Sequence, residues 1–163
     1  MIDYTKYISG KKELIDMTKL LLDPVIFNSL IEDMCKPFLN KKIDKVVAID
    51  AMGFVFGARI AEKLGVGLIL LRKGGKIGVA TKSLSFTDYS KTEKSLEVAT
   101  VALKAEERVL IVDEWSETGT QLKTAIKLIE SSGGKVIGIS CVSIDDEIKK
   151  DSTISKYMIY SVL

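Results

Sequence analysis

Two adjacent acids followed by a small polar turn are the residues of this chain best suited to chemistry. Residues 109–112 are apolar, Asp113 and Glu114 follow directly, and residues 117–121 are polar or small. Backbone N–H groups attract phosphate at such a turn, where a helix begins. Carboxylates beside the turn can accept hydrogen bonds from sugar hydroxyls or bind a metal that the ligand carries. The pattern therefore predicts a site for a phosphorylated sugar.

The turn is expected at the carboxyl end of a buried strand. Residues 109–113 read as a parallel strand because the run is apolar without alternation, and apolar residues recur at helical spacing over 118–131. Most turns of this kind bind nothing, so a packed strand end is the alternative. Neither the P-loop motif nor the glycine-rich dinucleotide fingerprint is present.

The rest of the chain predicts alternating strands and helices, and hence an α/β fold with a mostly parallel sheet flanked by helices. Residues 73–92 are rich in Gly, Ser, Thr and Lys and exceed an ordinary connection in length, so we expect a flexible lid loop there. The predicted helices are 14–22, 24–34 and 57–64, and the predicted strands are 45–50, 66–71, 95–101, 135–142 and 157–162.

Composition indicates a single domain spanning residues 1–163. The chain is 47% hydrophobic, has a net charge of +2 and contains no His, which argues against a metal bound by side chains alone. Cys35 and Cys141 lie in apolar contexts, so we expect free buried thiols and a cytoplasmic location. No apolar run approaches the roughly 20 residues that span a membrane. Scattered lysines argue against nucleic acid as a partner.

Two further strand ends carry residues that can approach a phosphorylated ligand. Gly53 and Gly57, after the strand 45–50, permit close backbone approach, although Phe54 and Phe56 beside them are expected in the core. Residues 72–76 combine three cations with two glycines and could hold a diphosphate. A solvated basic turn is the alternative for that cluster. Ligands bind where the carboxyl ends of parallel strands meet, which favours the functional interpretation.

The order and spacing of these segments resemble the adenine phosphoribosyltransferases, a branch of the type I phosphoribosyltransferases. The hydrophobic strand, the two acids and the Thr118-Gly119 turn resemble the signature that binds phosphoribosyl pyrophosphate. Residues 51–57 resemble the family's diphosphate loop, and residues 72–76 match its basic turn. Residues 14–24, within the N-terminal helical segment 1–40, are similar to its base-binding segment.

The resemblance implies a role for each segment, with Mg²⁺ bridging the diphosphate and held through the ligand rather than directly by the protein. It also implies a homodimer. The implied catalytic residues are Arg72, Lys76, Asp113 and Glu114, of which the two acids would bond the ribose hydroxyls. The implied ribose 5-phosphate site is Glu117, Thr118, Gly119, Thr120 and Gln121. The implied diphosphate site is Ala51, Met52, Gly53, Arg72, Lys73 and Lys76. The implied lid residues are Asp88 and Tyr89, and the implied base-binding residues are Leu14 and Ile15.

The chain departs from the family at several of these positions. Met52 stands where the diphosphate loop has Arg, and the loss of such a charge-assisted contact should cost about 1.5–3 kcal/mol. Arg59 or a lysine of the lid is the candidate to supply the missing charge. Thr120 and Gln121 replace Gly and Thr. The other departures are Leu14 for an aromatic residue, Ile15 for Arg, Gly78 for Pro and Asp88 for Glu.

These features predict an enzyme that joins a purine base, with adenine the expected one, to phosphoribosyl pyrophosphate, giving AMP and diphosphate. Two other functions stay open. Because Met52 removes a cation, the chain is alternatively a regulator that binds phosphoribosyl pyrophosphate or a nucleotide without turnover. A sugar-phosphate binding domain is the third. No motif in the chain determines which base is used.

Overall fold

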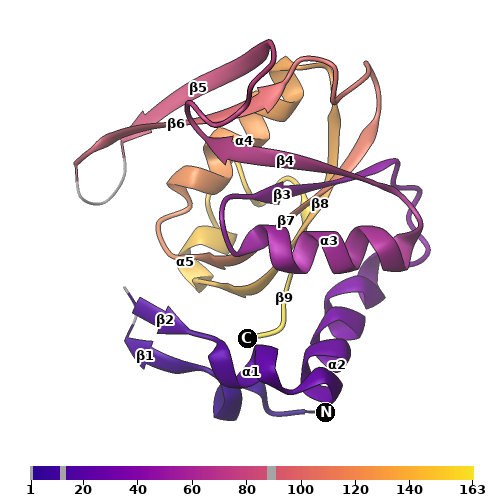
Figure 1. The fold of residues 1–163 in the computed structure, drawn as a ribbon, viewed down its shortest axis with the longest axis vertical. Coiled ribbons are helices and arrows are strands. Elements are labelled where there is room, and N and C mark those ends of the chain that lie inside the picture. The colour runs from indigo at the N-terminus through magenta and orange to yellow at the C-terminus, as the bar shows by residue number, and fades with distance from the viewer. Residues whose placement is uncertain (1, 12–13, 88–90) are drawn as a thin grey trace.

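A seven-stranded sheet forms the centre of the protein, with strand order β5-β6-β4-β3-β7-β8-β9 (Figure 1). The computed structural model describes residues 2–11, 14–87 and 91–163. The parallel strands are β3 (Lys45–Ile49), β4 (Gly67–Lys73), β7 (Arg108–Ser116), β8 (Lys135–Ile144) and β9 (Met158–Ser161). The antiparallel strands β5 (Thr81–Thr87) and β6 (Glu93–Ala99) extend the sheet beyond β4.

Helices cover both faces of the sheet, and each face has its own apolar core. Val47 of β3 lies in register with Ile69 and Ile111 of its two neighbours, and all three are buried in the core under α4 (Thr120–Ser131). The opposite face packs against α2 (Pro24–Cys35) and α3 (Gly53–Leu64). Strands buried on both faces explain why their sequences are unbroken apolar runs.

Local signals fix the helix ends. Asp23 caps α2, because its Oδ1 accepts hydrogen bonds from the backbone N–H groups of Val25 and Ile26 at 3.0 and 3.1 Å. Gly65 ends α3 in the left-handed conformation, with φ of 67°. The short elements are η1 (Tyr4–Tyr7), α1 (Thr18–Leu22), η2 (Lys36–Phe38) and α5 (Asp146–Lys149). Among the described residues, no helix has the length and apolar character needed to cross a membrane.

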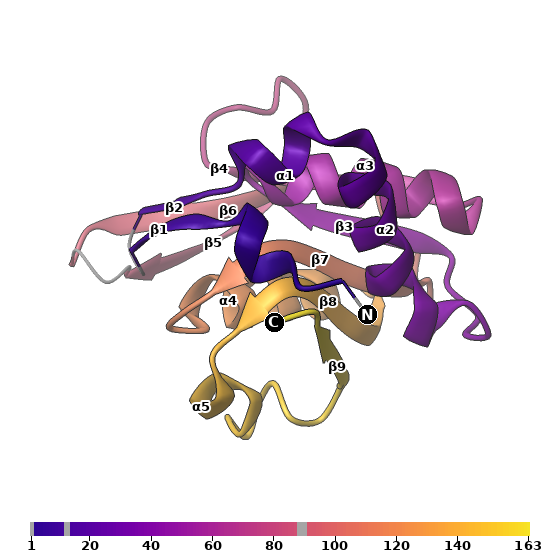
Figure 2. The same cartoon turned by 90° about the horizontal axis from the view of Figure 1, so that it is seen from below.

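Two hairpins project on the side where the parallel strands end. One is formed by β5 and β6, and the other by β1 (Ser9–Lys11) and β2 (Leu14–Asp16). Figure 2 shows from below that both hairpins extend in the same direction. The carboxyl edge of the sheet therefore lies between two projecting hairpins.

The predicted helix over 14–22 is wrong in its first part, because residues 14–16 form β2 and α1 begins only at Thr18. The Asp16 Oδ1 atom accepts hydrogen bonds from the Thr18 backbone N–H at 3.3 Å and from the Thr18 hydroxyl at 2.6 Å. This local turn competes with helix formation and separates strand from helix. The N-terminal segment 1–40 is thus a hairpin and helices together.

The expected loop over 73–92 is wrong for residues 81–87, which form β5 and pair with β6, whereas residues 74–80 are in neither a helix nor a strand. Leu84 and Phe86 alternate with polar residues and pack against the core under α4, and the Lys82 ammonium donates to the Ser131 carbonyl of that helix at 3.3 Å. Alternation of this kind is the mark of a half-buried strand. The predicted lid residues Asp88 and Tyr89 lie outside the described residues.

The remaining differences are in the ends of elements. Helix α3 begins at Gly53 rather than at residue 57, strand β7 continues to Ser116, and the one turn of α5 was not predicted. The strands predicted over 45–50, 66–71, 135–142 and 157–162 are present with small shifts at their ends.

Candidate functional site

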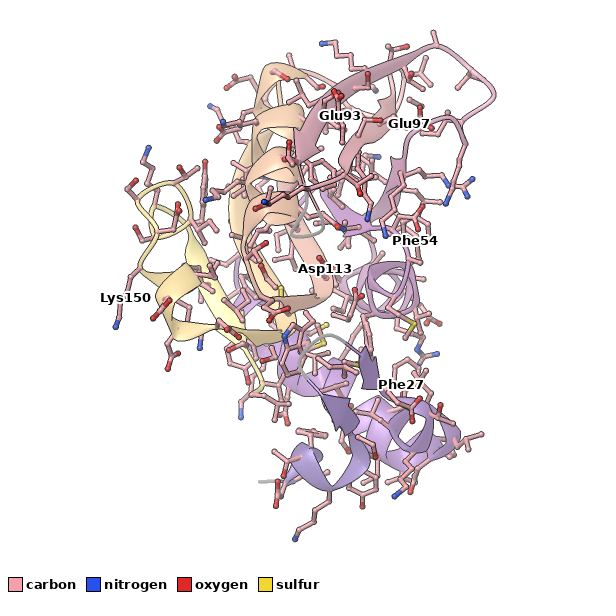
Figure 3. All side chains as sticks on the ribbon, turned by 90° about the vertical axis from the view of Figure 1, so that its left-hand side faces the viewer. Phe27, Phe54, Glu93, Glu97, Asp113 and Lys150 are labelled. Carbon is pink, nitrogen blue, oxygen red and sulfur yellow. The ribbon has the colours of Figure 1, made fainter. Side chains whose placement is uncertain are left out.

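The loop after β3 lies directly against the end of β7. A Cβ atom on Gly53 would stand 3.0 Å from the Val112 carbonyl oxygen and 3.2 Å from Asp113 Oδ1, so this approach requires glycine. At the start of α4, the Gln121 side-chain amide donates to the Asp50 carbonyl at 3.3 Å. Figure 3 looks onto this edge, with Asp113 near its middle and Phe54 of α3 beside it. Two of the predicted segments are therefore in contact.

Asp113 is the buried acid of this edge, with 4% of its surface exposed. Burial, followed by the neighbouring Glu114 carboxyl, raises the pKa of Asp113 well above its ordinary range, while the charge of Lys73 acts in the opposite direction. Asp113 Oδ1 accepts a hydrogen bond from the Glu114 backbone N–H at 2.9 Å. A ligand that brings hydrogen-bond donors or positive charge to Asp113 would therefore stabilise its ionised carboxylate.

Three buried polar atoms at this edge have no hydrogen-bond partner within the described part of the chain. They are Arg72 Nε, Glu114 Oε2 and Trp115 Nε1. Buried polar side-chain atoms in proteins are nearly always hydrogen-bonded. A polar ligand at the strand ends could supply partners to Arg72 Nε and Glu114 Oε2.

The turn after β7 has the geometry of an anion cradle. Gly119 takes a left-handed conformation, with φ of 69°, and precedes α4 without any side chain capping the helix. The Thr120 backbone N–H donates to the Thr118 hydroxyl at 3.4 Å. Of the predicted residues, Glu117, Thr118 and Gly119 connect β7 to α4, and Thr120 and Gln121 are the first two residues of α4. An uncapped helix start favours a bound anion.

Two cations of the predicted basic turn lie beside Asp50, which follows β3 and is only 6% exposed. The Lys76 ammonium lies 3.3 Å from Asp50 Oδ2, and the same oxygen accepts the Lys73 backbone N–H at 3.2 Å. Arg72 Nε is 4.0 Å away from it. The Asp50–Ala51 peptide bond is cis. The end of β3 and the end of β4 therefore form one cluster.

A second buried acid, Glu97 of β6, holds the backbone of the basic turn. Its Oε1 accepts hydrogen bonds from the Lys76 and Ile77 N–H groups at 2.7 and 3.0 Å. These hydrogen bonds, of which the one from Lys76 has the largest effect, keep the pKa of Glu97 below its usual range.

The sequence analysis did not predict Asp50 or Glu97 as residues of the site. Asp50 follows an apolar strand, as Asp113 does, and this position could have indicated a site residue. Nothing in the sequence around Glu97 indicates its hydrogen-bond partners.

Several of the residues named in the sequence analysis contact other parts of the chain. The Arg59 guanidinium donates to Asn28 Oδ1 at 2.8 Å and lies 3.3 Å from Glu62 Oε2, so the expectation that it supplies charge to the loop after β3 is wrong. Phe54 is half-buried rather than in the core, whereas Phe56 is buried as predicted. Met52 packs its half-buried side chain against the core under α2 and α3, and so does Ile15 of β2. Leu14 is also in β2.

We expect Asp113→Asn to raise the melting temperature of the ligand-free protein at neutral pH. Because the folded pKa of Asp113 is raised above its ordinary value of 3.8, the unfolded carboxyl ionises first. Its contribution to the free energy of unfolding is therefore fully present below that value and decreases as pH rises toward the folded pKa. Thermal melts of both proteins across pH should show the difference shrinking toward about pH 4. A variant that melts lower at every pH would contradict this.

Comparison with known proteins identifies the family. The phosphoribosyl transferase domain family matches residues 9–161. The chain belongs to this family. Among its phosphoribosyltransferase relatives, the adenine phosphoribosyltransferase of Maridesulfovibrio salexigens is 38% identical over 129 residues, covering 78% of this chain and 75% of that one. The adenine phosphoribosyltransferase of Clostridium botulinum is 34% identical over 148 residues, covering 91% and 86%.

Solved phosphoribosyltransferase structures share the fold along almost the whole chain. The adenine phosphoribosyltransferase of Thermoanaerobacter pseudethanolicus matches with a TM-score of 0.88 and 33% identity, covering 97% of this chain and 95% of that one. The Giardia lamblia enzyme, in complex with 9-deazaadenine, matches with a TM-score of 0.89 and 25% identity, covering 98% and 94%. The predicted fold class and the family resemblance are thus confirmed.

Proposed function

We propose that this phosphoribosyltransferase transfers the phosphoribosyl group of phosphoribosyl pyrophosphate to adenine, giving AMP and diphosphate in purine salvage. The observation that carries the proposal is that the acidic pair, Asp113 and Glu114, lies at the same strand ends as the start of α4 and the basic turn, whose Arg72 and Lys76 side chains lie 4.0 and 3.3 Å from Asp50. These three features match the ribose, the 5-phosphate and the diphosphate of that substrate. Relatives named adenine phosphoribosyltransferase support the choice of base.

Catalysis at this site would depend on positioning and charge. Residues 117–121 would hold the 5-phosphate, and Asp113 and Glu114 would accept hydrogen bonds from the ribose hydroxyls. Negative charge grows on the diphosphate as its bond to the ribose breaks, so Arg72 and Lys76 would stabilise the transition state more than the bound substrate. Ala51, Met52, Gly53 and Lys73 would complete the diphosphate site with backbone groups and one further cation.

Mg²⁺ is the cofactor that this substrate implies, and the site fits it. No group of three His, Cys, Asp or Glu side chains among the described residues could hold a metal, so an ion here needs oxygens from the ligand. Magnesium commonly binds through one or two carboxylates together with substrate phosphates. The ion would be held through oxygens of the ligand, whose ribose hydroxyls Asp113 and Glu114 would bind, and Glu114 Oε2 has no hydrogen-bond partner among the described residues. When bound, the ion would neutralise charge on the diphosphate.

The other parts of the proposal concern the base, the lid and the surroundings. Leu14 and Ile15 would line the base site on the β1–β2 hairpin, which projects beside the strand ends. Asp88 and Tyr89, which lie outside the described residues, would act as lid residues. We also propose a homodimer, as the family resemblance implies, and a cytoplasmic location. Cys35 and Cys141 are free and buried, which fits a reducing compartment.

A base screen tests the proposal directly. Adenine, hypoxanthine, guanine and xanthine are each supplied with phosphoribosyl pyrophosphate and Mg²⁺, and diphosphate release is followed. We expect release with adenine well above that with the other bases. Binding of phosphoribosyl pyrophosphate without release with any base would favour the second candidate, a regulator without turnover, for which the uncharged Met52 is the supporting observation.

Replacement of Met52 separates these two functions. Since Arg59 is bonded to Asn28 and Glu62, it does not replace the missing cation. We expect Met52→Arg to add a charge-assisted contact to diphosphate and to raise kcat/KM roughly tenfold. A regulator would gain affinity for phosphoribosyl pyrophosphate without turnover. Arg59→Gln is the matched control, expected to leave kcat/KM unchanged. A fall in both rate and affinity for Met52→Arg would show that the apolar packing of Met52 is what the site requires.

A further inference from the structure

One carboxylate oxygen of Asp50 lies close to three residues of the basic turn. Its Oδ2 atom lies 3.3 Å from the Lys76 ammonium, 3.2 Å from the Lys73 backbone nitrogen and 4.0 Å from Arg72 Nε. The Asp50 side chain is almost fully buried, whereas those of Arg72 and Lys76 are 36% and 46% exposed. A buried acid therefore faces two cations whose other sides are open to solvent.

Apart from the Lys73 N–H, which Asp50 accepts, the backbone of the turn is held by residues of β6. Glu97 accepts the N–H groups of Lys76 and Ile77, and the Gly74 N–H donates to the Ser95 carbonyl at 3.0 Å. Strand β6 thus fixes the course of the turn. The side chains of Arg72 and Lys76 can exchange one anionic partner for another while the turn stays in place.

We propose that Asp50 competes with diphosphate for Arg72 and Lys76, holding both cations in the empty site and taking them back when diphosphate leaves. The inference rests on the proposed function, which places diphosphate on these cations. It assigns Asp50 a positioning role, since the acid acts through the two cations and not on the reacting atoms. Met52 brings no further charge to the loop, so the exchange involves the basic turn alone.

The competition predicts that removing the charge of Asp50 strengthens binding of the anion. We expect Asp50→Asn to bind inorganic pyrophosphate about five- to tenfold more tightly, because a negative charge beside the bound anion is lost and the cations no longer have to leave Asp50. The asparagine retains an oxygen that can accept the Lys73 N–H. Affinity for AMP should be unchanged, since its phosphate would bind at residues 117–121.

The competition between Asp50 and diphosphate should also change the steady-state constants kcat and KM. We expect kcat of Asp50→Asn to decrease while KM for phosphoribosyl pyrophosphate also decreases, because both the substrate and the leaving diphosphate are held more strongly. A residue that only supports the fold would not lower KM.

Titration calorimetry with inorganic pyrophosphate and Mg²⁺ tests the proposal on four proteins: the unmodified chain, Asp50→Asn, Lys76→Gln and the double variant. Asp44→Asn is the matched control, because Asp44 precedes β3 at its other end and is likewise paired with an arginine, Arg108, at 3.1 Å. We expect tighter binding for Asp50→Asn, no change for Asp44→Asn, and little effect of Asp50→Asn once Lys76 is replaced.

The outcomes separate the two proposals. Unchanged or weaker pyrophosphate binding by Asp50→Asn would overturn the competition, and so would an equal gain in the Lys76→Gln background. If the unmodified chain itself does not bind pyrophosphate, the placing of diphosphate on the basic turn fails, and with it the proposed function. Should Asp50→Asn not fold, Asp50→Glu replaces it. The longer acid keeps the charge and, under competition, should not tighten binding.

Discussion

Gly119→Val is expected to abolish binding of a nucleoside 5′-phosphate. The residue has a φ of 69°, where a β-branched side chain is strained, and a Cβ atom would stand 2.8 Å from Ile148 Cγ2 and 3.2 Å from Ile154 Cδ1. The turn would have to move, and the N–H groups at the start of α4 would move with it. In a thermal shift experiment, AMP at a hundredfold excess over its Kd stabilises a binding protein by about 2.7 kcal/mol. We expect this shift to be absent in the variant.

Gly65→Val is the matched control for backbone strain. Gly65 has almost the same φ, 67°, but a Cβ atom there would meet nothing within 4 Å, and the residue ends α3 away from the strand ends. We expect this variant to lose stability and to keep its AMP-induced shift. Equal shifts in the unmodified protein and in Gly119→Val would show that the turn does not bind the 5-phosphate.

The second large effect is expected for the double replacement Asp113→Asn with Glu114→Gln. Amide oxygens accept weaker hydrogen bonds than carboxylates, and a hydrogen bond to a charged group contributes about 1.5–3 kcal/mol. Loss of both carboxylates should weaken binding of phosphoribosyl pyrophosphate with Mg²⁺ by at least about a hundredfold. Titration calorimetry measures this directly.

Unfolding would not explain such a loss, because the Asp113 replacement alone is expected to make the ligand-free protein more stable. The affinity for inorganic phosphate, which needs only residues 117–121, serves as the internal control and should be retained. Unchanged affinity for phosphoribosyl pyrophosphate would refute the assignment of the ribose to this acidic pair.

The parts of the fold that the sequence predicts well are those decided by continuous burial. The strands predicted over 109–113 and 135–142 are mostly apolar because both faces of the sheet are covered, and this signal is strong over short windows. Residues 14–16 were assigned to a helix because their apolar side chains continue the spacing of α1. The turn that ends the strand depends on two local hydrogen bonds from Thr18 to the Asp16 side chain, and the spacing of apolar residues does not reveal such bonds.

The residues of the candidate site that belong to one short motif could be predicted from the sequence. Contacts between segments far apart in the sequence could not. The acidic pair, the turn at Gly119 and the basic turn are each contiguous in sequence. The partners of Glu97 come from β4 and the turn behind it, so they follow from strand pairing that no single segment specifies. Arg59 was a candidate to supply charge to the loop after β3, whereas its guanidinium donates to Asn28 of α2.

The close packing of Gly53 on Asp113 means that the two loops do not vary independently. An added methyl group at Gly53 would press on the Asp113 carboxylate, and Gln121 already joins α4 to the Asp50 carbonyl. Free energies of substitution usually add for distant sites and fail to add for residues in contact. Mutational effects measured singly in the loop after β3 and in the turn after β7 should therefore not sum in combined variants. Any redesign of this enzyme for another base or another leaving group has to treat the two loops as one unit.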